Sequence, residues 1–212
     1  MRAHIGSDES GKGDYFGPLV VAAVYLDAGS AGELGAAGVK DSKSLSNNRV
    51  ATLATSVVAH CPHSTVVIGP KRYNELYQRI GNLNRLLAWA HARAIEDLLA
   101  EVDCTEVLVD KFADNAVLEK ALMEKGSGAR VTQRVRAEDD IAVAAASVLA
   151  RARFLDAIDE LSRDFAVRLA PGAGEPTLEA GRAFVARHGA GALAEVAKLH
   201  FKTTKKLAGG GR

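Results

Sequence analysis

The chain has 212 residues, of which 48% are hydrophobic and 25% are charged, and a formal net charge of +1. This composition can supply one globular core and excludes a largely disordered chain, while the near-neutral balance excludes a protein that is basic all over. Two cysteines, Cys61 and Cys104, are too few for a disulfide framework. No signal peptide or long apolar span precedes the first motif, so we expect a cytoplasmic protein with reduced thiols and no membrane partner.

The first predicted strands cover residues 3–8 and 18–27, and between them lies a motif of acids, glycines and a lysine. It contains Asp8, Glu9, Gly11, Lys12 and Gly13. Because side chains alternate along a strand, Asp8 and Glu9 can serve one site only if the chain leaves the sheet near Glu9, which the glycines permit. Backbone amides around such a turn, beside Lys12, suit a phosphate. A polar hairpin with solvated charges is the alternative interpretation.

The middle of the chain predicts core-building elements. Residues 28–38 are rich in glycine and alanine and predict a loop, and residues 64–69 predict a strand. Residues 84–99 have helical periodicity, which favours a helix that covers the core, with Trp89 in packing rather than base stacking. Lone histidines are more often structural or exposed, so we assign no catalytic role to His4, His60, His63, His91 and His188.

Two further acidic positions follow predicted strands at 105–110 and 130–135. Asp110 ends the first of these strands, where it could be a metal ligand or a helix cap. Glu138, Asp139 and Asp140 then precede a predicted helix over 141–161, and acids at a helix N-terminus are favourable without any chemistry. These positions alone leave both interpretations open.

Together, Asp8, Glu9, Asp110 and one of residues 138–140 form a set of hard oxygen ligands, with no cysteine or histidine set spaced for zinc. Such a set favours Mg²⁺ or Mn²⁺. Two such ions about 3.5–4 Å apart can activate a water and stabilise the leaving oxygen in phosphodiester hydrolysis. The sequence therefore predicts a two-metal nuclease site.

The C-terminal region is basic. Residues 171–176 predict a loop, and residues 198–206 carry lysines that we assign to nucleic-acid binding, because each phosphate they neutralise releases counterions. Residues 207–212 predict a flexible tail, which leaves residues 1–206 as one domain. Strands that alternate with helices predict a layered α/β fold, and the short first connection makes the first two strands antiparallel in an otherwise mixed sheet.

The stretch from Ile5 to Pro18 resembles the first active-site motif of the type 2 ribonucleases H, and its Gly-Lys-Gly resembles the ribonuclease HIII branch. Further matches follow in order: Lys40 to Ser46, Asn82 to His91, Val109 to Phe112, Ala137-Glu138, Ala144 to Arg151 and Ala197 to Phe201. The resemblance covers residues 4–204. It implies the ribonuclease H-like fold, a mixed sheet flanked by helices.

The resemblance also implies an endonuclease that cuts the RNA strand of RNA–DNA hybrids and leaves 5′-phosphate and 3′-hydroxyl ends. Asp8, Glu9, Asp110 and Glu138 match the metal-binding carboxylates, although Asp139 and Asp140 adjoin the fourth. The substrate contacts that it implies, together with the basic positions assigned above, are Gly11, Lys12, Gly13, Ser42, Lys43, Ser147, Lys198, His200 and Lys202. For Ser42, Lys43 and Ser147, capping or packing is the alternative.

Two departures from the family pattern bear on substrate choice. The ribonuclease HII branch uses a tyrosine in its second half to recognise a single ribonucleotide, and this chain has no tyrosine after Tyr77. Ribonucleases HIII usually carry an N-terminal domain that resembles the TATA-box-binding fold, which we expect to be absent here, with weaker substrate binding unless another surface compensates. The alternatives are single-ribonucleotide excision and a non-cleaving hybrid-binding protein. A monomer is the simplest expectation.

Overall fold

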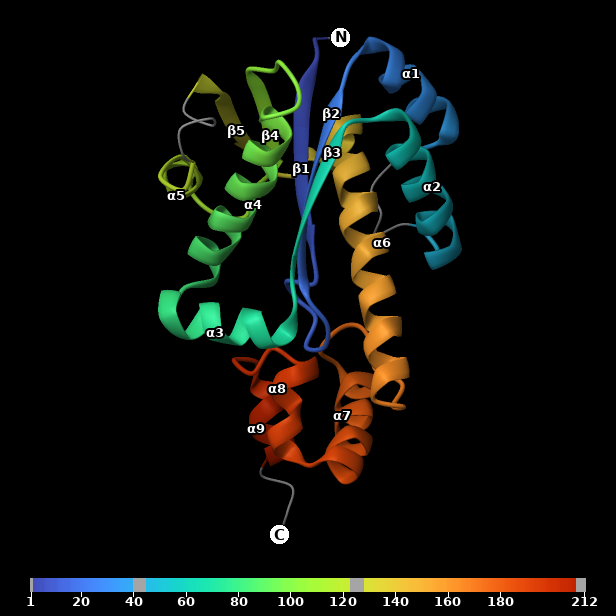
Figure 1. Ribbon diagram of the computed structural model, residues 1–212, viewed down its shortest axis with the longest axis vertical. Helices are drawn as coiled ribbons and strands as arrows, with labels where there is room; N and C mark the ends of the chain where they lie inside the picture. The colour runs from blue at the N-terminus through green and yellow to red at the C-terminus, as the bar shows by residue number, and fades with distance from the viewer. Residues whose placement is uncertain (1, 40–44, 123–127, 209–212) are drawn as a thin grey trace. The chain divides into compact units, whose positions relative to one another are not determined.

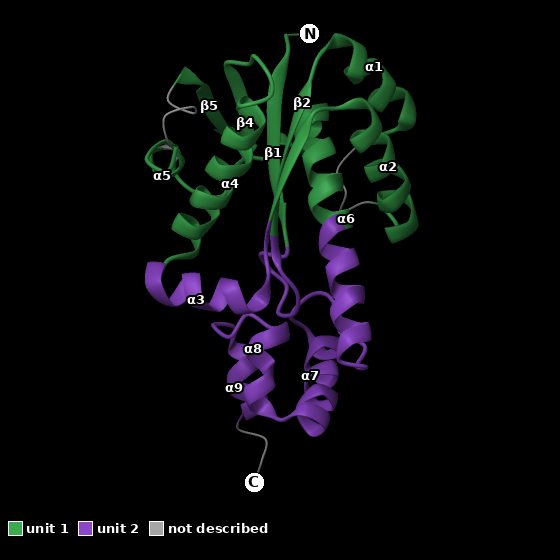
Figure 2. Cartoon of the chain, in the orientation of Figure 1, with its two compact units in different colours: residues 1–10, 20–66, 82–152 green, residues 11–19, 67–81, 153–212 purple. Residues whose placement is uncertain are grey.

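The computed structural model describes residues 2–39, 45–122 and 128–208. Figure 2 shows two compact units, one of residues 1–10, 20–66 and 82–152, the other of residues 11–19, 67–81 and 153–212. The strands are β1 (His4–Ser10), β2 (Leu19–Leu26), β3 (His63–Ile68), β4 (Glu106–Asp110) and β5 (Arg130–Arg134). The helices are α1 (Ala28–Ala37), α2 (Asn47–His60), α3 (Pro70–Ile80), α4 (Leu83–Leu99), α5 (Asn115–Glu119), η3 (Ala137–Asp139), α6 (Ile141–Asp164), α7 (Glu175–His188), η4 (Ala190–Ala192), α8 (Leu193–Val196) and α9 (Lys202–Ala208).

A five-stranded mixed sheet has the strand order β3-β2-β1-β4-β5 (Figure 1). β1 pairs antiparallel with β2 from His4↔Leu26 to Ser10↔Val20, because the connection between them is too short for a helical crossover. β1 and β4 are parallel, and so are β4 and β5. Each strand lies within two residues of its predicted range, which confirms the predicted α/β class and mixed sheet.

The long helices α4 and α6 confirm the predicted periodic segments. Asn82 caps α4 by accepting a hydrogen bond from the Arg85 amide (3.1 Å), and the predicted inward face of α4 is fully buried. Trp89, on the same helix, has 44% of its surface exposed, so it lies outside the buried face. β2 is a nearly continuous buried run, as expected for a strand inside a sheet.

The prediction of a loop over residues 28–38 is also wrong, because residues 28–37 form α1. A reciprocal capping box starts this helix. Asp27 accepts from the Ser30 amide (2.9 Å), and the Ser30 hydroxyl accepts from the Asp27 amide (3.0 Å). Gly38 ends it with φ = 79°, a left-handed conformation that glycine adopts without strain. The caps outweigh the low helix propensity of the internal glycines.

The second unit contains the turn after β1, α3, and the C-terminal helices. Its backbone is joined by an antiparallel bridge between Phe16 and Ala197. Leu207 is buried in α9, where its side chain lies so close to Gly181 of α7 that a Cβ at Gly181 would come within 2.5 Å of it. Leu207 and Ala208 are thus helical, and the predicted start of a flexible tail at residue 207 is wrong. None of the helices in the described ranges is both long and apolar enough to cross a membrane.

Candidate active site

The candidate site begins at the carboxyl ends of two parallel neighbouring strands. The ladder between β1 and β4 runs from Ile5↔Val107 to Ser7↔Val109, so the next residues are Asp8 on β1 and Asp110 on β4. Parallel strands end at the same edge of a sheet, which is where functional groups of α/β folds gather. The sheet therefore brings together two carboxylates that are 102 residues apart in the chain.

Asp8 lies on the face of β1 that α6 covers. A Cβ at Gly6, two residues earlier on this face, would lie 2.2 Å from the Ala142 carbonyl carbon, so only glycine allows α6 to come this close. Asp8 is 5% exposed and is hydrogen-bonded by Ser147 of α6. Burial, then the adjacent charge of Glu9, raise the pKa of the Asp8 carboxyl to about 7, against the hydrogen bonds that it accepts, and Asp110 adds to this rise.

Glu9 lies on the opposite face of β1, beside α4. Its carboxylate Oε2 is 3.2 Å from Nε2 of His91, a fully buried side chain. The strand continues to Ser10, so the chain leaves the sheet only after Glu9, at Gly11, where φ is 86°. Asp8 and Glu9 thus keep the alternation of an ordinary strand, and the expected departure from the sheet at Glu9 is wrong. The two carboxylates still interact, because the charge of Glu9 is among the causes that raise the pKa of Asp8.

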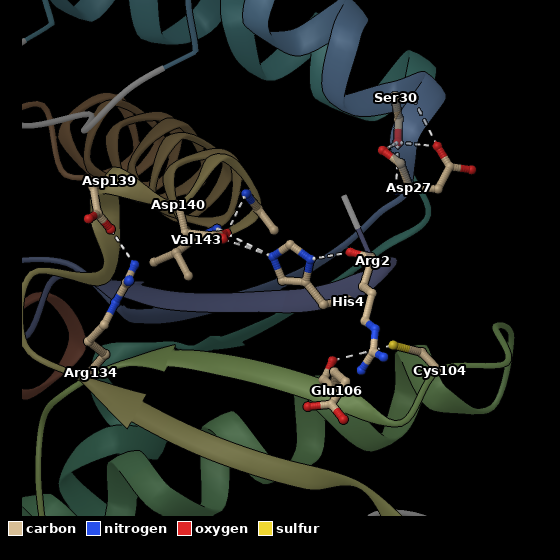
Figure 3. Close-up of polar contacts among 11 residues, drawn as sticks. Arg2, His4, Asp27, Ser30, Cys104, Glu106, Arg134, Asp139, Asp140 and Val143 are labelled. Carbon is tan, nitrogen blue, oxygen red and sulfur yellow. Dashed lines mark hydrogen bonds and ion pairs between the residues drawn. The ribbon is translucent and has the colours of Figure 1, made fainter.

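The three acids before α6 have different surroundings, and Figure 3 shows two of them, Asp139 and Asp140. Asp139 is exposed and pairs with Arg134. Asp140 accepts from His4 Nε2 (2.9 Å) and from the amide of Ala142 (2.9 Å), so it caps α6. Glu138 is half-buried, and within the described residues its carboxylate has no hydrogen bond or ion pair. Of the three carboxylates, Glu138 is the one left available for a ligand.

Asp110 is connected to this segment. Its Oδ1 accepts a hydrogen bond from the Ala137 amide (3.0 Å), which places the backbone of Glu138 next to the end of β4. One carboxylate oxygen of Asp110 thus binds the backbone at the start of η3, although the N-cap residue of η3 is Arg136. Across the described residues, no three histidine, cysteine or acidic side chains lie close enough to share one ion. The donor chemistry fits Mg²⁺ or Mn²⁺, whereas a closed ligand set is not assembled there.

The glycine turn belongs to the second unit and has its own supports. At Gly11 a Cβ would lie 2.1 Å from the Pro18 carbonyl oxygen, so the turn requires glycine there. Oδ1 of Asp14 accepts a hydrogen bond from the Gly172 amide (2.6 Å), and the backbone amide of Tyr15 donates one to the Gly172 carbonyl (2.8 Å). Lys12 is half-exposed and Gly13 is exposed, whereas Gly11 is buried.

Lys198 does not have the role that the sequence predicted. Its ammonium is fully buried and donates to the carbonyls of Asp14 (2.9 Å), Phe16 (3.4 Å) and Gly17 (2.7 Å). Burial lowers the pKa of this lysine to about 7, against the opposing charge of Asp14. A side chain enclosed in this way cannot reach a phosphate, so we correct Lys198 from a substrate contact to a support of the turn.

The other predicted substrate residues have mixed surroundings. Lys202 is exposed on α9, and His200 is exposed and stacks on Tyr77, with ring centroids 4.4 Å apart. Burial, then the charge of Lys198, lower the pKa of His200. Ser147 is buried against Asp8 rather than exposed to substrate. Ser42 and Lys43 lie outside the described residues. His91 ends the family-matching segment that begins at Asn82, but its contact was missed, since nothing in that segment shows that it reaches a strand 82 residues away.

Known proteins with similar sequences and structures indicate the family of this chain. The family model of ribonuclease HII matches residues 5–204. The chain is 47% identical to a ribonuclease HIII of Protochlamydia amoebophila, over 99% of this chain and 69% of the relative, and 44% identical to one of Chlamydia abortus, over 96% and 69%. Its structure is similar to the crystal structure of Bst-RNase HIII in complex with Mn²⁺, with a TM-score of 0.89, 35% identity, and coverage of 98% of this chain and 69% of that one.

The fold and these matches define the class of the protein as a ribonuclease H, and therefore an enzyme. The chain belongs to the type 2 ribonuclease H family, on its ribonuclease HIII branch.

Proposed function

We propose that this protein is a divalent-metal-dependent endonuclease that hydrolyses the RNA strand of RNA–DNA hybrids and leaves 5′-phosphate and 3′-hydroxyl ends. The observation that carries the proposal is the pair of acids at the ends of β1 and β4. Asp8 is buried beside Glu9 and Asp110, and its pKa is raised to about 7. Like charges kept together in this way are stabilised by a cation, and a polyanionic substrate would otherwise be repelled.

Asp8, Glu9, Asp110 and Glu138 would hold two Mg²⁺ or Mn²⁺ ions. Bound there, the ions would supply an activated water and charge stabilisation at the leaving oxygen. Ser147 fixes the Asp8 carboxylate by a hydrogen bond, and the Ala137 amide fixes that of Asp110. The Mn²⁺ in the crystal structure of Bst-RNase HIII supports this choice of ion. Glu138 is favoured as the fourth ligand because Asp139 and Asp140 already have partners.

Substrate recognition would depend on the backbone and on polar side chains. We assign Gly11, Lys12 and Gly13 to the ribose 2′-hydroxyls and phosphates, since the 2′-hydroxyl is the group that distinguishes RNA from DNA. Lys202 and His200 would contact the duplex from the exposed side of their segment. Ser42 and Lys43 stay sequence predictions. The absence of any tyrosine after Tyr77 favours cleavage within runs of ribonucleotides over excision of a single one.

The test is cleavage of a labelled RNA–DNA hybrid by the wild type and by Asp8→Asn and Asp110→Asn, in Mg²⁺, in Mn²⁺ and in excess chelator. We expect the wild type to cut only with metal, and each variant to lose at least about 1,000-fold in rate with its fold intact by circular dichroism. Asp97→Asn is the matched control, because Asp97 pairs with Arg93 on the surface of α4. Metal-independent cutting, or activity kept in either variant, would contradict the proposal.

A further inference from the structure

His91 links α4 to β1 through both of its ring nitrogens. Nδ1 is 2.8 Å from Ser7 Oγ, and Nε2 is 3.2 Å from Glu9 Oε2. Ser7 and Glu9 are two residues apart and share the face of β1 that α4 covers. The imidazole is fully buried, so water does not compete for either nitrogen. One side chain on the helix therefore contacts the strand at two successive positions of the same face.

Ser7 also bonds to a backbone carbonyl, and this second bond decides whether Nδ1 of His91 donates or accepts. Ser7 Oγ also lies 2.8 Å from the Ala22 carbonyl oxygen, which can only accept, so the single hydroxyl proton of Ser7 is donated there. Nδ1 of His91 must then carry a proton and donate it to Ser7. On the other side of the ring, Nε2 lies against the Glu9 carboxylate. The ring is thus held by Ser7 and directed at Glu9.

The plane of the ring is fixed as well. Phe112 stacks on His91 with ring centroids 4.8 Å apart and an interplanar angle of 6°. Phe112 follows β4 by two residues, in the segment directly after Asp110. Residues of β1 and of the segment after β4 thus both contact the imidazole on α4. A residue that only fills space would not need these contacts, since an apolar side chain could fill the same volume.

We propose that His91 is a positioning residue that orients the Glu9 carboxylate for a divalent cation. This inference rests on the proposed function, because it takes Glu9 to be a metal ligand. Hydrogen bonds to the back of a ligand limit its rotation, and their loss typically costs about 10–100-fold in metal affinity. In this proposal His91 is not itself a metal ligand. It acts through Glu9, and Ser7 and Phe112 act through His91.

The test uses side chains that keep one contact at a time. His91→Asn places an amide near the position of Nδ1, so it can keep the Ser7 contact but loses Glu9. His91→Gln reaches the position of Nε2 and can keep the contact with Glu9. His91→Met fills the volume and loses both contacts. Trp89→Ala, on the exposed side of the same helix, is the control. Binding of Mn²⁺ alone is measured by calorimetry, with thermal melts of each metal-free variant.

We expect the Mn²⁺ affinity to fall about 10–100-fold in His91→Asn and His91→Met, and to stay within about threefold of wild type in His91→Gln and Trp89→Ala. A lower melting temperature with unchanged Mn²⁺ affinity in the Asn and Met variants would make His91 a packing residue and overturn the inference. An equal loss in His91→Gln would also overturn it, even if the other two variants failed to fold. A wild type that binds no Mn²⁺ would overturn the proposed function as well. Failure of the proposed function thus differs from failure of the His91 inference alone, in which the wild type still binds Mn²⁺.

Discussion

Glu138 differs from its two acidic neighbours in what its carboxylate contacts. Asp139 pairs with Arg134, and Asp140 is bound to His4 and the start of α6. We predict that Glu138→Gln lowers the rate of hybrid cleavage by at least about 100-fold, because it removes a metal ligand. Asp139→Asn is the matched control and should stay within about threefold of wild type. If single-turnover rates fell in Asp139→Asn and not in Glu138→Gln, Asp139 would be the fourth ligand.

The contact between His4 and Asp140 predicts a pH-dependent stability. The hydrogen bond to Asp140 is the largest effect on His4, and it raises the pKa of His4 above 6.5. Burial acts to raise the pKa of Asp140, but the hydrogen bond and charge of His4, with the amides of Val143 and Ala142, hold it below 3.8. Stability from the raised histidine is present below pH 6.5 and is lost as the pH rises, and stability from the lowered aspartate is lost as the pH falls.

Both contributions are thus present together between about pH 4 and 6.5. His4→Asn should cost about 1 kcal/mol of unfolding free energy near pH 5.5 and clearly less near pH 8.5. Urea unfolding at the two pH values measures the difference. His60→Asn is the control, since His60 lies on the surface of α2 and contacts only a carbonyl in its own helix, among the residues described. An equal cost for His4→Asn at both pH values would contradict the assignment.

At the scale of elements, the packing of α6 on β1 depends on Gly6. A methyl group there would overlap the backbone of Ala142 and Val143, which cannot move as a flexible side chain could. We predict that Gly6→Ala destabilises the protein by about 3 kcal/mol or more and weakens metal binding, because Asp8 is two residues away. Gly32→Ala in α1, where nothing lies within 4 Å, should instead stabilise by about 0.5–1 kcal/mol. Chemical unfolding of both variants is the measurement.

The turn between β1 and β2 depends on Lys198 in a comparable way. Lys198→Met leaves the carbonyls of Asp14, Phe16 and Gly17 without their buried donor, so we predict a loss of about 2–4 kcal/mol. Lys202→Met, at an exposed position four residues later, should change stability by less than about 0.5 kcal/mol and should weaken hybrid binding at low salt. If Lys198→Met left stability unchanged and Lys202→Met lowered it, the roles assigned to the two lysines would be reversed.

Which elements the sequence predicted depends on how local their signals are. Strands with apolar runs and the periodic helices α4 and α6 carry their evidence within a few residues, and they were predicted. α1 was missed because its glycines obscured the capping signal of Asp27 and Ser30. The exposure of Trp89 did not follow from the sequence, because helical periodicity gives the buried face of α4 but not its width.

The candidate site also contains residues that local motifs predict and contacts that depend on distant parts of the chain. Asp8, Glu9, Asp110 and Glu138 follow from motifs, and the structure places Asp8 and Asp110 at neighbouring strand ends. The burial of Lys198 and the contacts of His91 depend on residues 80 to more than 180 positions apart, which no short motif reports. A lysine in a basic segment looks the same in the sequence whether it faces solvent or three carbonyls.

The protein as a whole is predicted to cleave RNA within RNA–DNA hybrids in a metal-dependent reaction. The most direct measurement offers the wild type two labelled duplexes, in Mg²⁺ and separately in Mn²⁺. One has an all-RNA strand on DNA, and the other has a DNA strand with a single ribonucleotide. We predict cleavage of the first duplex at many internal positions, with 5′-phosphate products, and little or no cleavage of the second. No cleavage of the all-RNA strand with either metal would contradict the proposed function.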